Sequence, residues 1–177
     1  MILNLEEEIL REQSKAQVLR ISAWIGGSER RMADLMELFL NGPTDVSRRA
    51  AWVIGYTSEC RPHLLRPWYK KMLWKVKNSG VHPAVRRNVM KALSSADIPP
   101  PLLGTAAAIA FRELASPDSP VAVRVYSMIL LGALAERKPA LRHELQGTIE
   151  QVLMHPTPGL ASRGRKILRR LAVLPLQ

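Results

Sequence analysis

The chain has 177 residues, of which 47% are hydrophobic, 23% are charged and 5% are aromatic. These values are ordinary for one folded domain with a sizeable core, and the low aromatic content favours helix over strand. The net charge of +11 favours an anionic partner such as nucleic acid, although a protein that is simply basic throughout would carry it too.

Three features indicate a cytoplasmic protein without a membrane span. The longest apolar run without a charge, roughly Pro99 to Phe111, is too short to cross a bilayer. The first residues lack the charged and then apolar succession of a secretory leader. The single cysteine, Cys60, excludes an internal disulfide framework and fits a reducing compartment. We therefore expect a cytoplasmic location.

Polar capping residues divide the first forty residues into three predicted helices. Asn4 precedes a helix over 5–12 whose first turn is acidic, where the helix dipole favours anions. Ser14 and Gln17 have the spacing of a capping box for a second helix, which ends at a Gly-Gly pair. A third helix is predicted over 28–41 and ends at an Asn-Gly-Pro turn.

A helix, a proline-containing turn and a second helix then recur. The second helices align on four apolar anchor positions that lie 39, 38 and 37 residues apart, namely Val46, Val85, Val123 and Leu160. Apolar or small residues follow each anchor four, seven and eight positions later, which is the buried stripe of an amphipathic helix. The first helices of the pairs are predicted over 28–41, 62–78, 99–115 and 139–154. No stretch alternates apolar and polar residues over five positions, so no strand is predicted.

A two-helix period of this length, with proline at the turn and a Val-Arg step at Val85 and Val123, resembles the HEAT-repeat family. The resemblance covers residues 28–174, with residues 1–27 as an N-terminal helical cap. It implies one all-α domain over 1–177, a right-handed α-solenoid of about four helix pairs with nine or ten helices. Two segments also look like small uncharacterised bacterial HEAT-like proteins, a likeness that implies no activity: Ser47–Val53 and Val121–Met128.

The candidate binding site lies on the second helices, on the face opposite their core stripe. HEAT arrays usually turn this face toward a concave surface. Rotation by 100° per residue places basic, polar and aromatic residues on it, namely Arg48, Arg49, Trp52, Tyr56, Arg87, Asn88, Lys91, Tyr126, Arg163, Lys166 and Arg170. We call this set the concave stripe. Alternatively, Trp52 packs between neighbouring repeats and the arginines bond to backbone carbonyls or to neighbouring turns.

A second basic surface is predicted on the helix over 62–78. The core face of this helix is expected to hold Leu65, Trp68, Met72 and Val76, and the other side carries Lys70, Lys71, Trp74 and Lys77. A tryptophan among lysines can stack on a base while the amines hold phosphates. Alternatively, the tryptophan covers the neighbouring helix and the lysines around it are solvated.

No catalytic residue, metal ligand or cofactor is predicted. The four histidines form no i, i+4 pair and, with one cysteine, make no zinc set. Cys60 lacks the surroundings of a nucleophile, and there is no glycine-rich phosphate loop. HEAT-like alkylpurine DNA glycosylases use Trp, Asp and Arg in a concave cleft. Trp52, Arg48 and Arg49 fit that pattern, but no aspartate projects from the middle of a concave helix.

The sequence favours a non-enzymatic scaffold that binds a protein or peptide on its concave face. Val125 and Ile129 interrupt the basic stripe, and an apolar break suits the hydrophobic anchor of a peptide better than a phosphate backbone. The first alternative is nucleic-acid binding through the same stripe, with Lys70, Lys71 and Lys77 added. A DNA glycosylase of the alkylpurine type is the less favoured alternative. No membrane partner is expected, and the sequence leaves the partner's identity, the oligomeric state and the continuity of the basic track open.

Overall fold

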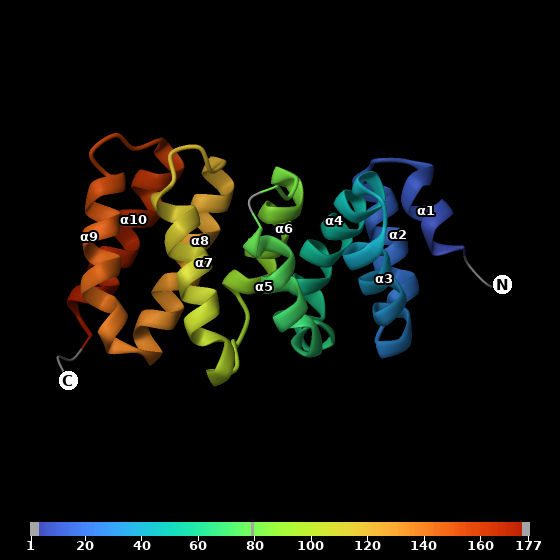
Figure 1. Ribbon diagram of the computed structural model, residues 1–177, viewed down its shortest axis with the longest axis horizontal. Helices are drawn as coiled ribbons and strands as arrows, with labels where there is room; N and C mark the ends of the chain where they lie inside the picture. Colours follow the sequence, from blue (N-terminus) through green and yellow to red (C-terminus); the bar gives the residue numbers. More distant parts are fainter. Residues whose placement is uncertain (1–3, 79, 175–177) are drawn as a thin grey trace. The chain divides into compact units, whose positions relative to one another are not determined.

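The computed structural model describes residues 4–78 and 80–174 (Figure 1). Within that part the chain is all-helical, with ten α-helices, three short 3-10 helices and no strand, as the sequence predicts. Residues 1–3, 79 and 175–177 of the predicted domain lie outside it. The elements are α1 (Leu5–Arg11), α2 (Lys15–Ile25), α3 (Glu29–Asn41), α4 (Thr44–Cys60), η1 (Pro62–Trp68), α5 (Tyr69–Lys77), α6 (Pro83–Ser94), η2 (Pro100–Leu102), α7 (Leu103–Ala115), α8 (Val121–Arg137), η3 (Pro139–Leu141), α9 (Arg142–Val152) and α10 (Pro158–Ala172).

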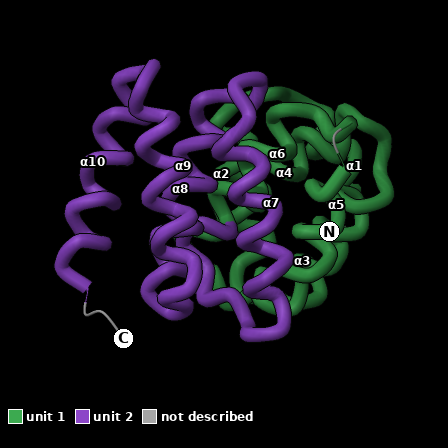
Figure 2. The backbone as a smooth tube through the Cα atoms, turned by 60° about the vertical axis from the view of Figure 1, so that its left-hand side comes forward, with its two compact units in different colours: residues 1–92 green, residues 93–177 purple. Residues whose placement is uncertain are grey.

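The chain divides into two compact units, residues 1–92 and residues 93–177 (Figure 2). The first unit contains α1 to α5 and all of α6 except its last two residues. The second contains α7 to α10. One domain over the whole chain, with a cap over 1–27 and repeats over 28–174, stays a prediction.

Side-chain caps start the first three helices at the predicted residues. The side chains of Asn4, Ser14 and Ser28 each accept a hydrogen bond from the backbone N–H three residues later, at 3.4, 3.0 and 3.3 Å. Each bond satisfies an N–H group that the first turn of a helix leaves unpaired. Gln17 does not close the predicted capping box, because its amide Oε1, the atom that would accept from the Ser14 N–H, accepts from Arg20 instead. Its Nε2 donates to the Glu8 carboxylate at 3.1 Å. This bond joins α2 to α1.

The four anchor positions of the repeat are all buried. Val46, Val85, Val123 and Leu160 occupy the same place near the start of α4, α6, α8 and α10. The positions four, seven and eight residues later are buried as well in the first three of these helices. In α10 the last of them, Leu168, is only half-buried, so the predicted core stripe is incomplete there. The repeat frame is otherwise confirmed.

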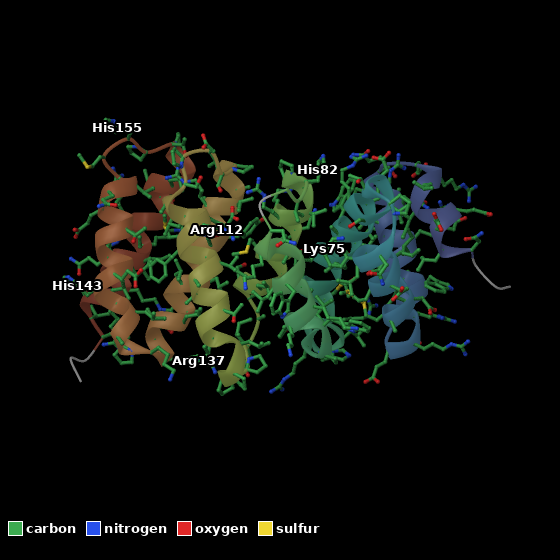
Figure 3. The ribbon with its side chains drawn as sticks, in the orientation of Figure 1. Lys75, His82, Arg112, Arg137, His143 and His155 are labelled. Carbon is green, nitrogen blue, oxygen red and sulfur yellow. The ribbon has the colours of Figure 1, made fainter. Side chains whose placement is uncertain are left out.

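The first unit is built around α4, which contacts α1, α2, α3 and η1. Helix α6 packs against α4 where Gly55 faces Asn88; a Cβ at position 55 would lie 2.7 Å from the Asn88 Oδ1. Helix α5 is joined to α3 through Lys75 (labelled in Figure 3), whose Nζ donates to the Leu40 carbonyl at 2.9 Å. The core face of α5 differs slightly from the prediction, since Tyr69 is buried and Trp68 only half-buried.

The second unit is built around α8, which contacts α7, α9 and α10. This helix is apolar nearly all round, and it is buried on more than one side because three helices pack against it. Figures 1 and 2 show α7 beside α8 and α9 beside α10. At the C-terminal end of α8, Arg137 (labelled in Figure 3) donates to the Ile98 carbonyl at 2.7 Å and pairs with Asp97 at 3.1 Å.

Candidate functional site

The two arginines of the concave stripe on α4 are bonded to the N-terminal helices. Arg48 pairs with the Asp45 carboxylate at 3.2 Å and donates to the Gln13 side chain at 3.1 Å. Arg49 donates to the backbone carbonyls of Ile9 and Leu10 at 3.4 and 2.9 Å. Those carbonyls belong to the last turn of α1, which has no helical partner for them. Arg49 therefore holds α1 in place, as the alternative interpretation of the stripe expects.

The two aromatic residues of the stripe on α4, Trp52 and Tyr56, are half-buried. Trp52 lines a small hollow together with Arg49 and residues of α1 and α2, among them Ile9 and Ile21. Trp52 therefore lies beside the N-terminal helices, whereas the alternative interpretation placed it between neighbouring repeats.

On α6 the stripe is split between surface and interior. Arg87 is exposed, and Lys91 pairs with Glu59 of α4 at 2.8 Å. Asn88 is 4% exposed, and its amide donates to the Ala84 carbonyl at 2.9 Å. The prediction that Asn88 lies on a binding surface is wrong. The missing side chain at Gly55 brings α4 so close to α6 that Asn88 is enclosed between the two helices.

On α8 and α10 the stripe lines a surface hollow of about 190 Å³, here called the α8–α10 hollow. Its lining residues are Ser94, Ile129, Gly132, Ala133, Glu136, Arg163, Ile167, Arg170 and Leu171. Arg170 grips the Glu136 carboxylate with two contacts, Nε to Oε1 at 2.5 Å and Nη2 to Oε2 at 2.8 Å. Arg163 is half-buried at the wall of the hollow. Of the remaining stripe residues, Tyr126 is half-buried and Lys166 is exposed, and neither lines the hollow.

The α8–α10 hollow is lined by both apolar and charged side chains. Gly132 of α8 lies beside Ile167 of α10, and a Cβ there would be in ordinary van der Waals contact with it at 3.5 Å. Ile129 and Leu171 supply apolar surface, and Arg163 supplies a positive charge. An arrangement of this kind can bury an apolar side chain while the guanidinium binds a neighbouring carboxylate.

The second predicted surface is exposed along α5. Lys70, Lys71, Trp74 and Lys77, here called the α5 lysine face, are all exposed, and Trp74 reaches 56%. The Nζ of Lys77 lies 4.5 Å from the centre of the Trp74 ring. The Nζ of Lys71 lies 5.0 Å from the centre of the Trp68 ring. The alternative interpretation of this surface was that Trp74 covers a neighbouring helix. With more than half of its surface exposed, Trp74 does not do so.

A further hollow that the sequence does not predict lies between α9 and α10, with a volume of about 510 Å³. It is lined on one side by Leu168, Leu171 and Leu174 and on the other by Arg142 and His143 (labelled in Figure 3). Leu168 stands at a core-stripe position, so the sequence predicts that it is buried. The structure shows that it is only half-buried, and the sequence alone therefore does not reveal the hollow.

Among the described residues, no three His, Cys, Asp or Glu side chains gather as a metal ion would require. His82 accepts a hydrogen bond from the Ala84 N–H at 3.1 Å, which places it at the start of α6. Cys60 is exposed and donates to the Tyr56 carbonyl at 3.4 Å. None of the described helices combines the length and the hydropathy needed to cross a membrane.

Comparison with known proteins gives one match. A family model described as a HEAT repeat domain matches residues 5–171, which is nearly the whole chain. No curated protein and no solved structure matches the chain significantly.

Proposed function

The chain belongs to the HEAT repeat domain family, and we propose from this premise that it is a non-enzymatic scaffold that binds a protein or peptide. HEAT repeats stack into right-handed α-solenoids, and their extended concave faces bind partners. Applied to this chain, about four helix pairs present the concave stripe, and residues 1–27 cap the stack. The single thiol of Cys60 is consistent with a cytoplasmic location. The proposed function needs no cofactor.

The α8–α10 hollow is the observation that carries this proposal. It brings together three residues that lie on the concave stripe or beside it: Ile129, Arg163 and Arg170. Protein interfaces place an apolar anchor in a pocket and surround it with polar groups. Ile129 supplies the apolar part and Arg163 the polar part. A peptide segment with one apolar side chain next to an acidic residue matches this lining.

Nucleic-acid binding along the concave stripe has less support. Four of its cations already have partners within the protein, namely Arg48, Arg49, Lys91 and Arg170. A phosphate would have to compete with each of these bonds. The free energy gained from each new phosphate contact would be reduced by the free energy of the internal bond that it replaces. Asn88 is buried and cannot reach a ligand. The stripe therefore offers few side chains for a continuous phosphate track.

The glycosylase alternative has the least support. The only aspartate on α4, α6, α8 and α10 is Asp45, in the first turn of α4 and paired with Arg48. The carboxylate nearest a hollow on these helices is Glu136, which Arg170 holds on both oxygens.

Affinity capture tests the scaffold proposal. The full chain would be used as bait in a native lysate, with and without nuclease, beside the variants Ile129→Asp and Arg163→Ala. The expected result is a set of proteins that survives nuclease and is lost with both variants. Arg165→Ala is the matched control, because Arg165 is an exposed arginine of α10 outside the hollow. Capture that disappears with nuclease, or that both hollow variants retain in full, would count against the proposal.

A further inference from the structure

The most basic part of the chain surrounds the α5 lysine face. Residues 60–96 contain nine Lys and Arg residues and no Asp or Glu. An average stretch of this length would carry several acidic side chains, since about a quarter of residues are charged and the signs are mixed. The local field here is therefore positive, with no acidic groups inside the stretch to neutralise it.

Helix geometry concentrates part of this charge on one side of α5. Tyr69, Met72, Leu73 and Val76 are buried on the inner side. The members of the α5 lysine face fall within about a third of the helix circumference on the other side, at 100° per residue. Lys70 and Lys71 are adjacent in the sequence, and Lys77 lies about 9–10 Å further along the helix axis, with Trp74 between them.

One lysine of α5, Lys75, is not part of the α5 lysine face, and packing against α3 explains its position. Lys75 is half-buried, donates to the Leu40 carbonyl at 2.9 Å and lies 5.8 Å from the centre of the Phe39 ring. Lys70 and Lys71 are exposed instead. Charges on solvated lysines contribute little to stability, so the contact of Lys71 with the Trp68 ring adds only a small amount to the stability of the fold.

The indole of Trp74 is the second unusual feature of the α5 lysine face. A tryptophan is normally well buried, because its large apolar surface favours removal from water. Trp74 is 56% exposed, whereas Trp24, Trp52 and Trp68 are all half-buried. Its ring already lies beside one ammonium group, that of Lys77. An exposed ring among cations is the combination with which proteins bind single-stranded nucleic acid: bases stack on the ring and amines hold the phosphates.

We propose that the α5 lysine face binds single-stranded RNA or DNA with little sequence preference. Trp74 stacks on a base, and Lys70, Lys71 and Lys77 bind neighbouring phosphates. A duplex hides the faces of its bases, so it can use only the lysines. A lysine ammonium group cannot form the bidentate hydrogen bonds with which the guanidinium of arginine recognises guanine, so sequence discrimination is weak. This site lies on a different element from the α8–α10 hollow, and the proposal does not depend on the scaffold function.

Other anionic partners match the surface less well. An amphipathic helix that lies on a membrane buries a broad apolar face, and the exposed side of α5 offers a single large apolar residue, Trp74. An acidic peptide would pair with the lysines but has no flat ring to place against the indole. A nucleobase uses both parts of the surface.

Fluorescence anisotropy with the full chain tests the proposal. The probes are a labelled oligothymidine and oligouridine of about 20 nucleotides and a mixed-sequence duplex of equal length. We expect both single strands to bind more tightly than the duplex, with a log–log salt slope of about 2, since each single-strand phosphate contact contributes ~0.7. Polyglutamate should compete poorly, and vesicles of phosphatidylcholine with phosphatidylserine should not bind. A duplex that binds as tightly, effective competition by polyglutamate or firm vesicle binding would each overturn the proposal.

Variants separate stacking from charge. Trp74→Leu should weaken single-strand binding about fivefold or more, whereas Trp74→Phe, which keeps a ring, should lose less. Lys70→Gln with Lys71→Gln should reduce the salt slope by about 1.4. Lys15→Gln with Lys138→Gln removes the same charge from exposed positions outside α5 and should leave the slope unchanged. All the substituted residues are exposed in the wild-type chain, and thermal unfolding would verify that each variant is folded. Full binding by Trp74→Leu, or an equal effect of both lysine pairs, would overturn the proposal.

Discussion

Gly55 of α4 and Asn88 of α6 lie so close together that a Cβ on residue 55 would come within 2.7 Å of the Asn88 Oδ1. Asn88 has little freedom to yield, because it is buried and its amide is bonded to the Ala84 carbonyl. This pair sets the distance between the two helices. The missing side chain of Gly55 and the buried amide of Asn88 thus determine how the second helices of neighbouring repeats pack in the first unit.

We expect Gly55→Ala to destabilise the protein by about 1–3 kcal/mol, the usual cost of an extra methyl in a full core. The better helix propensity of alanine offsets at most ~1 kcal/mol of this. The measurement is the free energy of unfolding from urea titration. Gly147→Ala is the control, since residue 147 is exposed on α9 with nothing within 4 Å of its Cβ; it should stabilise by up to ~1 kcal/mol. If both substitutions change the free energy of unfolding by the same amount, the contact with Asn88 does not contribute to stability.

Leu130→Ala should destabilise the protein by about 2–5 kcal/mol, because Leu130 is 1% exposed on the helix at the centre of the second unit. The loss combines the transfer of the removed groups with the cavity that they leave. Thermal and urea unfolding would both report it. Val121→Ala on the same helix changes an exposed side chain and should stay within ~0.5 kcal/mol. A loss that small at Leu130 would contradict its placement in the core.

Glu8 should make the first unit sensitive to acid. The hydrogen bond from Gln17 is the largest cause of the lowered pKa of the Glu8 carboxyl, and burial, the next largest, opposes it. The charges of Arg20 and Arg11 lower the pKa further. A pKa that is lower in the folded state than in the unfolded state adds stability above the unfolded pKa. That stability is lost as the pH falls below about 4.5 through the folded value.

Urea unfolding between about pH 7 and pH 3 would measure this effect. The difference in unfolding free energy between the wild-type chain and Glu8→Gln should be largest near neutral pH and shrink toward acid. Gln17→Ala removes the donor and should also flatten the acid response. A pH profile of Glu8→Gln that runs parallel to that of the wild-type chain would contradict the prediction.

Neutral substitutions on the concave stripe should have little effect on nucleic-acid binding. Lys91 is already paired with Glu59, so Arg87→Gln with Lys91→Gln should lower the salt slope by less than the ~0.7 of one single-strand phosphate contact. The same oligonucleotide titrations measure it, with the Lys70 and Lys71 pair as the comparison. A larger fall for the stripe pair would favour the nucleic-acid alternative on the second helices over the scaffold.

The helices and the frame of the repeat follow from local spacing in the sequence. Asn4, Ser14 and Ser28 cap their helices through bonds that span three residues, and such local bonds can be predicted from spacing alone. The anchors, such as Val46 and Leu160, follow from the periodicity of apolar residues, because a helix must bury one face. The family match over residues 5–171 rests on the same pattern.

Long-range packing sets which side chains of the predicted stripe are available to a partner. Arg49 binds carbonyls about 40 positions earlier, and Lys91 binds a glutamate of the preceding repeat. Asn88 is enclosed because Gly55 lets two helices approach. Helix rotation gives the direction in which a side chain points but not how close the next helix lies. Asn88 and Trp74 both lie outside the predicted core faces of their helices, yet Asn88 is buried and Trp74 is exposed.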